Sequence, residues 1–177
     1  MNDQLIGFYR GASLDIAGRL IEEVWSFGYA ELEEVHDYIQ WLFPSAKASQ
    51  YNPDAPLLDA ATIELFVNDK DLKERLGKSF ALMLDFYGLE LVRETDATTV
   101  SKAAHYADRK SIWQDAPPGY LNHNLLRLTR IIEALNVLGL SDESVALCRC
   151  LAEIQAEEPE KIPVETAQFW HVAAGLN

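Results

Sequence analysis

The feature that most restricts the fold is the spacing of large apolar residues in the segment 70–87. These residues recur every three or four positions and therefore lie along one side of a helix; they are Leu72, Leu76, Phe80, Met83 and Phe86. Gly88 follows directly and is typical of the residue that ends a helix. The segment predicts a long helix with one buried side.

The same spacing recurs along most of the chain and predicts further helices. They cover 14–26, 30–43, 59–68, a segment that begins at Asn122 or Asn124 and runs to 138, and 141–156, with a short last helix that has Pro163 in its first turn. The stripe of the first helix includes Leu14, Pro44 ends the second, and Ser141 is placed to cap the fifth. Strand-like alternation of apolar and polar residues is nearly absent. The fold class expected is all-α, a compact, bundle-like single domain.

Two segments are less regular. Residues 45–57 contain two prolines and no periodicity, which predicts a long ordered loop held by specific contacts. Between 89 and 121, Leu89-Glu90-Leu91-Val92 is compatible with a short extended piece and 108–114 with a short helix.

Charge restricts the partners. The 177 residues carry a net charge of −13, which disfavours nucleic acid and anionic membrane surfaces, because both bind through Lys and Arg. No run approaches the roughly 20 apolar residues of a membrane span. The start, Met1-Asn2-Asp3-Gln4, lacks the features of a signal peptide. Cys148 and Cys150, two residues apart on a predicted helix, point to nearly opposite sides and cannot bridge each other, so reduced thiols and a cytoplasmic location are expected.

The first candidate site lies in the segment 122–130. At about 100° per residue, His123, Arg127 and Arg130 fall on one side of a helix, beside its leucine row. Two guanidiniums and an imidazole suit a carboxylate or a phosphate, because arginine donates two parallel hydrogen bonds. The alternative is structural, with the arginines paired to internal carboxylates.

The second candidate is the run HDYIQWLFP at 36–44. On a continuous helix, His36 and Gln40 would share one face, while Asp37 and Trp41 would share another. A histidine near a carboxylate can act as a base or as a metal ligand. The alternative is a helix that carries its aromatic residues into the core.

Signatures of catalysis are weak. The four histidines have no metal-ligand spacing, GxSxG is absent, and neither a Walker loop nor a dinucleotide fingerprint occurs. No metal, no cofactor and no enzymatic activity are therefore expected.

Four segments together resemble the conserved region of the opioid growth factor receptor family. They are Phe8-Tyr9-Arg10, the run HDYIQWLFP, Phe86-Tyr87-Gly88-Leu89-Glu90-Leu91, and the stretch from His123 to Ile131. The resemblance covers residues 7–152, which it implies form the conserved helical domain, with 153–177 a helical extension packed on it. The size of the chain resembles a stand-alone, bacterial-type member. Animal members are described as receptors for a short opioid peptide. The resemblance supplies no catalytic residue.

These observations lead to one preferred hypothesis and two alternatives. The preferred hypothesis is a non-enzymatic binding module that holds a peptide segment, a protein or a small anion in a cleft. The residues expected to line this cleft are Arg10, His36, Tyr38, Gln40, Trp41, His123, Arg127 and Arg130. The first alternative is a structural or protein-interaction domain in which these residues form an internal polar network. The second is an enzyme with His36 or His123 as general base.

Overall fold

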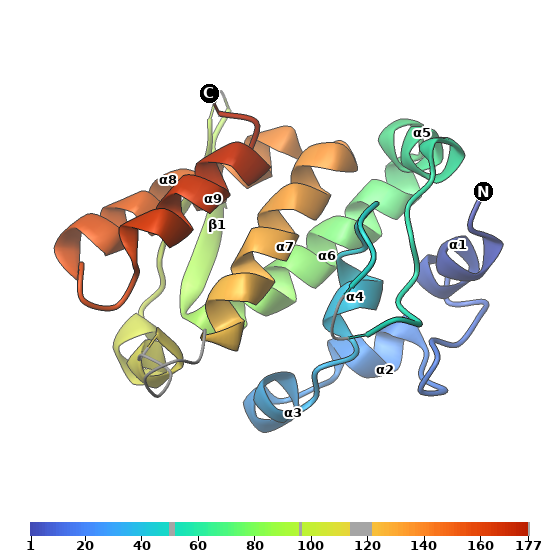
Figure 1. Ribbon diagram of the computed structural model, residues 1–177, viewed down its shortest axis with the longest axis horizontal. Coiled ribbons are helices and arrows are strands. Elements are labelled where there is room, and N and C mark those ends of the chain that lie inside the picture. Colours follow the sequence, from blue (N-terminus) through green and yellow to red (C-terminus); the bar gives the residue numbers. More distant parts are fainter. Residues whose placement is uncertain (50–51, 96, 114–121, 177) are drawn as a thin grey trace. The chain divides into compact units, whose positions relative to one another are not determined.

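The computed structural model describes residues 1–49, 52–95, 97–113 and 122–176. The chain divides into two compact units, Met1–Leu82 and Met83–Asn177, and each is described by itself. Helices make up most of the described residues (Figure 1). No helix in these ranges is long and apolar enough to cross a membrane.

The first unit is built from short helices. They are α1 (Asp3–Tyr9), α2 (Ile21–Trp25), α3 (Tyr29–Glu34), α4 (Ile39–Leu42), α5 (Ala60–Asn68) and the first part of α6 (Lys70–Tyr87). The prediction for α6 is confirmed at both ends, and Gly88 has the positive φ, 72°, expected of a residue that ends a helix. Asp59 caps α5 as expected, accepting from the N–H of Thr62.

Aromatic side chains form much of the core of this unit. The rings of Tyr9 and Phe66 meet edge to face with centroids 4.7 Å apart, and those of Phe8 and Trp41 at 5.2 Å. The buried Tyr9 hydroxyl donates to the carbonyl of Leu42, so α1 is tied to α4. Burial raises the pKa of Tyr9 well above its ordinary value, so the hydroxyl stays protonated.

The prediction of a helix over 14–26 is wrong in its first half. Only Ile21–Trp25 is helical, and Leu14 and Ile16 are exposed. The reason is local, because the Asp15 carboxylate accepts from the N–H groups of Ala17 and Arg19, each at 2.9 Å. A short acidic side chain that captures nearby amides in this way favours a turn over a helix.

The prediction of a single helix over 30–43 is also wrong. The segment is divided between α3 and α4, and between them Val35 takes extended backbone angles, φ −83° and ψ 132°. The buried Tyr38 hydroxyl donates back to the carbonyl of Leu32 at 2.8 Å. This bond and the burial of the Tyr38 ring hold the bend, which a helical periodicity in sequence does not reveal.

The predicted loop over 45–57 is anchored at its ends. Ser45 and Leu57 form an isolated parallel bridge, and the N–H of Leu58 donates to the carbonyl of Ser45 at 3.0 Å. Residues 50 and 51 lie outside the described ranges. The bridge brings the two ends of this long connection together.

The second unit comprises the rest of α6 and the elements that follow it. They are β1 (Leu89–Arg93), β2 (Thr98–Lys102), the 3-10 helix η1 (Tyr106–Trp113), α7 (His123–Val137), α8 (Ser141–Glu157) and α9 (Val164–Ala173). The three α-helices contact one another, and α8 also packs against β2. Figure 1 shows α8 and α9 running side by side, with β1 behind them.

Most helix predictions in this unit are confirmed. Asn122 caps α7, and Gly139 follows that helix with φ 90°. Two details differ. Ser141 is the first residue of α8, and its side chain caps nothing, because Leu140 holds the cap position. The short helix expected over 108–114 is η1, and Gln114 lies outside the described residues.

The all-α prediction needs one correction. β1 and β2 pair antiparallel, from Leu89 opposite Lys102 to Arg93 opposite Thr98, so the unit contains a two-stranded sheet. β1 contains the extended piece expected from 89 to 92, but β2 was not anticipated. Each strand has only five residues and shows too little alternation to identify it from sequence alone.

Candidate functional site

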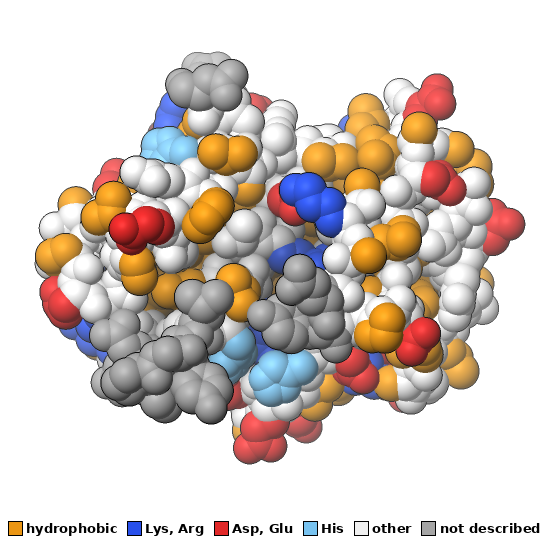
Figure 2. Space-filling model, viewed as in Figure 1, with side chains coloured by type: hydrophobic (Ala, Val, Ile, Leu, Met, Phe, Trp, Pro, Cys, Tyr) orange, Lys and Arg blue, Asp and Glu red, His pale blue; other side chains and the backbone are white. Residues whose placement is uncertain are grey.

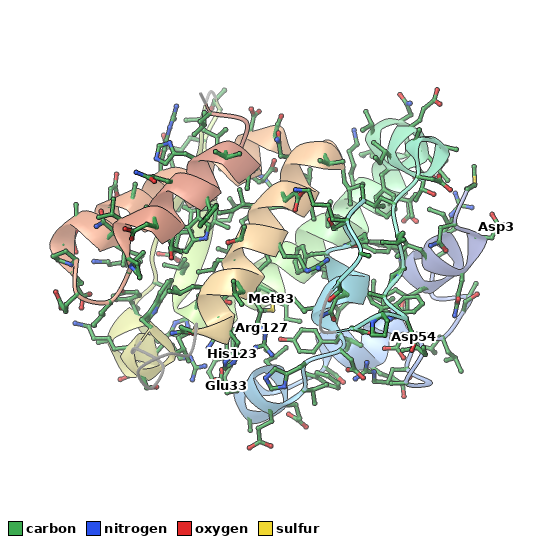
Figure 3. The ribbon with its side chains drawn as sticks, in the orientation of Figure 1. Asp3, Glu33, Asp54, Met83, His123 and Arg127 are labelled. Atoms are coloured by element: carbon green, nitrogen blue, oxygen red, sulfur yellow. The ribbon has the colours of Figure 1, made fainter. Side chains whose placement is uncertain are left out.

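The candidate site in the second unit begins at the N-terminus of α7. The Asn122 side chain accepts from the N–H of Asn124 at 2.9 Å and donates to the carbonyl of Ile112 at 3.2 Å. One amide therefore caps the helix and fixes it to η1. His123, the first residue of α7, and Arg127 leave the same half of the helix (Figure 3).

Arg127 is held in place by its own helix. It is only 5% exposed, and its Nη1 donates to Oδ1 of Asn124 at 3.2 Å. The backbone carbonyl of Asn124 accepts from the buried Tyr87 hydroxyl at 2.9 Å. The guanidinium is thus oriented by the side-chain amide of Asn124, which is buried and whose Nδ2 donates to the carbonyl of Ile112 at 3.5 Å.

Arg130 lies one turn further along α7 and is partly buried. Burial lowers its pKa, and the nearby charge of Glu133 acts in the opposite direction without cancelling that effect. A lowered arginine pKa means that the surroundings disfavour the charge.

The segment 36–44 lies in the first unit and does not form one helical face. His36 is exposed and precedes α4, so His36 and Gln40 do not share a helix. With the Gln40 amide assigned in the orientation that satisfies both its ends, it donates to the carbonyls of His36 and Asp37 at 3.1 and 3.0 Å. Gln40 therefore stabilises the turn before α4.

The aromatic residues of this segment are interior. Tyr38 and Trp41 are fully or almost fully buried, and Tyr38 also stacks edge to face on Phe27. Among the residues that the structure describes, the Nε1–H of Trp41 has no hydrogen-bond acceptor. Packing in the core accounts for the positions of both side chains. Their contact with a ligand stays a prediction.

Arg10 follows α1 and is paired within the first unit. Its Nη2 lies 2.9 Å from Oδ2 of Asp69, the residue that precedes α6. Asp69 also accepts from the N–H of Leu72 at 3.2 Å. The backbone bond to Leu72 and the Arg10 pair lower the pKa of the Asp69 carboxyl.

A polar cluster in the first unit was missed by sequence reasoning. The Arg19 guanidinium bridges two carboxylates, with Nε 2.7 Å from Oδ2 of Asp15 and Nη2 2.7 Å from Oδ1 of Asp37. It also lies 5.8 Å from the centre of the Phe27 ring. The only signal in the sequence was an i,i+4 acid–base pair, which is common on exposed helices.

Each unit thus holds part of the predicted cleft. The second contains His123, Arg127 and Arg130, and the first contains the other five residues. The prediction that the two sets form one cleft stays a prediction. The described residues contain no group of three or more acidic, His or Cys side chains placed to bind a metal ion.

Known proteins match most of the chain. Residues 10–167 match the family model described as the opioid growth factor receptor conserved region. The opioid growth factor receptor of Homo sapiens is 35% identical over 152 residues, which is 84% of this chain and 21% of that protein.

This chain belongs to the opioid growth factor receptor family.

Other members show the same range of similarity. The opioid growth factor receptor of Mus musculus is 36% identical over 139 residues, 77% of this chain and 21% of its own length. Opioid growth factor receptor-like protein 1 of Mus musculus is 35% identical over 125 residues, 69% of this chain and 25% of its own length. The chain thus spans about a fifth to a quarter of these relatives. No solved structure matches it.

Proposed function

We propose that this member of the family is a non-enzymatic binding module that works in the cytoplasm. Its ligand is a peptide segment whose acidic group lies against the cationic side of α7. This cationic side is defined by His123, Arg127 and Arg130. The relatives are named receptors, which supports a binding role over a catalytic one.

The observation that carries the proposal is the placement of Arg130 beside Arg127 on one side of α7. Arg130 is only partly buried and can contact a carboxylate, whereas Arg127 is 5% exposed and is held by Asn124, so it adds its positive charge from beneath the surface. Arginine also binds a carboxylate through two parallel donors.

Charge supports the same ligand class. The chain carries a net charge of −13, yet this part of α7 gathers two arginines and a histidine on one side. Figure 2 shows the acidic side chains of the visible face dispersed over it. The lowered pKa of Arg130 is what an added carboxylate would reverse.

A second candidate is a structural role for the residues of the first unit. Arg10 is paired with Asp69, Asp37 with Arg19, and Gln40 with backbone carbonyls. In this case the motif at 36–44 maintains the fold and binds nothing. Substitution of Gln40 would then lower stability and leave ligand affinity unchanged.

The test uses fluorescein-labelled nonapeptide pools, random except for a fixed central Asp or Asn. We expect the Asp pool to bind at least about tenfold more tightly in low salt, because hydrogen bonds to charged groups are worth about 1.5–3 kcal/mol. Fluorescence anisotropy measures the affinity. Arg130→Gln should remove the preference for Asp.

Arg149→Gln is the matched control, because Arg149 is exposed on α8 and its substitution changes the net charge equally. Equal binding of the two pools contradicts the proposal. The proposal is also contradicted if Arg149→Gln loses as much of the preference for the Asp pool as Arg130→Gln does.

A further inference from the structure

The hairpin of the second unit has one set of backbone groups directed away from its own ladder. The N–H of Ala103 donates to the carbonyl of Gly88, and the N–H of Glu94 donates to the carbonyl of Ala97, both at 2.9 Å. In an antiparallel pair, hydrogen-bonded and non-hydrogen-bonded residues alternate. The alternation assigns Glu90 and Val92 to the ladder with β2.

The remaining residues of β1 therefore point their N–H and C=O groups outward. They are Leu89, Leu91 and Arg93. No hydrogen bond from the rest of the described chain reaches the backbone of Leu91 or Arg93, and the sheet has two strands only.

We propose that the outer edge of β1 binds an extended peptide as a third, antiparallel strand. An open strand edge offers a row of donors and acceptors that fits any extended backbone. The specificity then comes from side chains that alternate along the edge. This inference goes beyond the proposed function and is independent of α7.

The side chains of β1 define the partner. Glu90 and Val92 are exposed and lie on one face of the hairpin, while Leu91 is half-buried on the other. On an antiparallel partner, an apolar residue would face Val92, another apolar residue Leu91, and a basic residue Glu90. The partner is thus an extended segment with two adjacent apolar residues followed by Lys or Arg.

Charge favours this partner over a second copy of the chain. Two copies would each bring a net charge of −13, whereas a basic segment is attracted. Pairing β1 with itself also places Glu90 opposite Glu90 or Glu94 in two of the possible registers. Such like-charge cross-strand pairs are destabilising.

The probe is the peptide acetyl-Ser-Thr-Val-Ile-Lys-Thr-Ser-amide, titrated into the whole chain labelled with ¹⁵N. Its Ile pairs with Leu91, so N-methylation of Ile removes a facing donor and introduces a methyl group into the interface. N-methylation of Val is the matched control, because that N–H points away from β1. We expect the Ile-methylated peptide to lose saturable binding and the Val-methylated one to stay within about twofold, because only the first loses a hydrogen bond to β1 and places a methyl group in the interface. Amide shifts should be largest at Leu89, Leu91 and Arg93.

A charge exchange tests the register. Glu90→Lys should weaken binding of the Lys peptide and restore affinity for the same peptide with Glu in place of Lys. Glu153→Lys, an equal charge change at an exposed position of α8, should alter neither preference. A preference that changes equally in both variants overturns the assigned register.

Two further outcomes overturn the proposal. One is an absence of amide shifts with peptide at 2 mM, which is about the weakest dissociation constant expected for a short added strand. The other is a dimer in analytical ultracentrifugation that Leu91→Pro converts to a monomer, because the edge is then occupied by a second copy. Leu91→Pro removes only an outward N–H, which an edge strand tolerates.

Discussion

The Asp15 carboxylate accepts a hydrogen bond from the Arg19 guanidinium at 2.7 Å while its own side chain is completely shielded from solvent. Asp15 also accepts two backbone N–H groups and so holds the turn that precedes α2. The second carboxylate on Arg19, from Asp37, is much more exposed. The two acids therefore differ in burial while sharing one cation.

Asp15→Asn should destabilise the protein strongly. It removes the anion from a buried pair, and breaking such a pair typically costs about 3–5 kcal/mol. Urea unfolding followed by circular dichroism measures the loss. Asp37→Asn is the matched control and should cost less than about 1 kcal/mol, because its carboxylate is partly solvated. Equal losses in the two variants would contradict the assignment of Asp15 as the buried partner.

Gly88→Ala should also be destabilising. Gly88 has φ 72°, and a Cβ there would lie 2.7 Å from the Cα of Tyr106, a backbone atom that cannot move independently. The strain of the left-handed conformation adds about 1 kcal/mol or more to this clash. Gly77→Ala, inside α6 with nothing near its Cβ, should instead stabilise by about 0.5–1 kcal/mol. Thermal unfolding compares the two, and similar melting temperatures would exclude the close approach at Gly88.

The Arg10–Asp69 pair predicts a pH dependence. The folded-state pKa of Asp69 is lowered by its backbone bond to Leu72 and by Arg10, so its contribution to stability is fully present above the ordinary value of 3.8. That contribution is lost as the pH falls through the lower folded pKa. The difference in melting temperature between wild type and Asp69→Asn should therefore shrink between pH 6 and pH 2. A difference that grows on acidification would be inconsistent with this sign.

Cys150 should be unreactive in the folded protein. Burial raises the pKa of its thiol to about 12, and burial raises that of Cys148 as well. Because the thiolate is the reactive form, alkylation by iodoacetamide at pH 8 should be on the order of a thousandfold slower for Cys150 than in urea. Mass spectrometry of each cysteine peptide gives the two rates. Rapid labelling of native Cys150 would show that α8 opens readily.

Local signals in the sequence determined the long helices. The apolar stripes of α6 and α7, and the glycines that follow them in sequence, Gly88 and Gly139, are patterns of neighbouring residues that can be identified without knowing a distant partner. The cationic side of α7 follows from the same arithmetic, since His123, Arg127 and Arg130 are fixed by helical spacing. The resemblance to the family was carried by these segments and was confirmed by the family model.

Tertiary structure decided the features that depend on contacts between separate segments of the chain. The break between α3 and α4 depends on the burial of a tyrosine whose hydroxyl bonds back to Leu32. Arg19 joins two acids that are 22 residues apart in the chain (from position 15 to 37). Pairing of β1 with β2 was hidden for the same reason, because a five-residue strand is stable only through its partner. Apolar periodicity indicates which side of a segment would be buried if the segment formed a regular helix. These features arise instead where contacts with other segments stabilise the fold more than a continuous helix would.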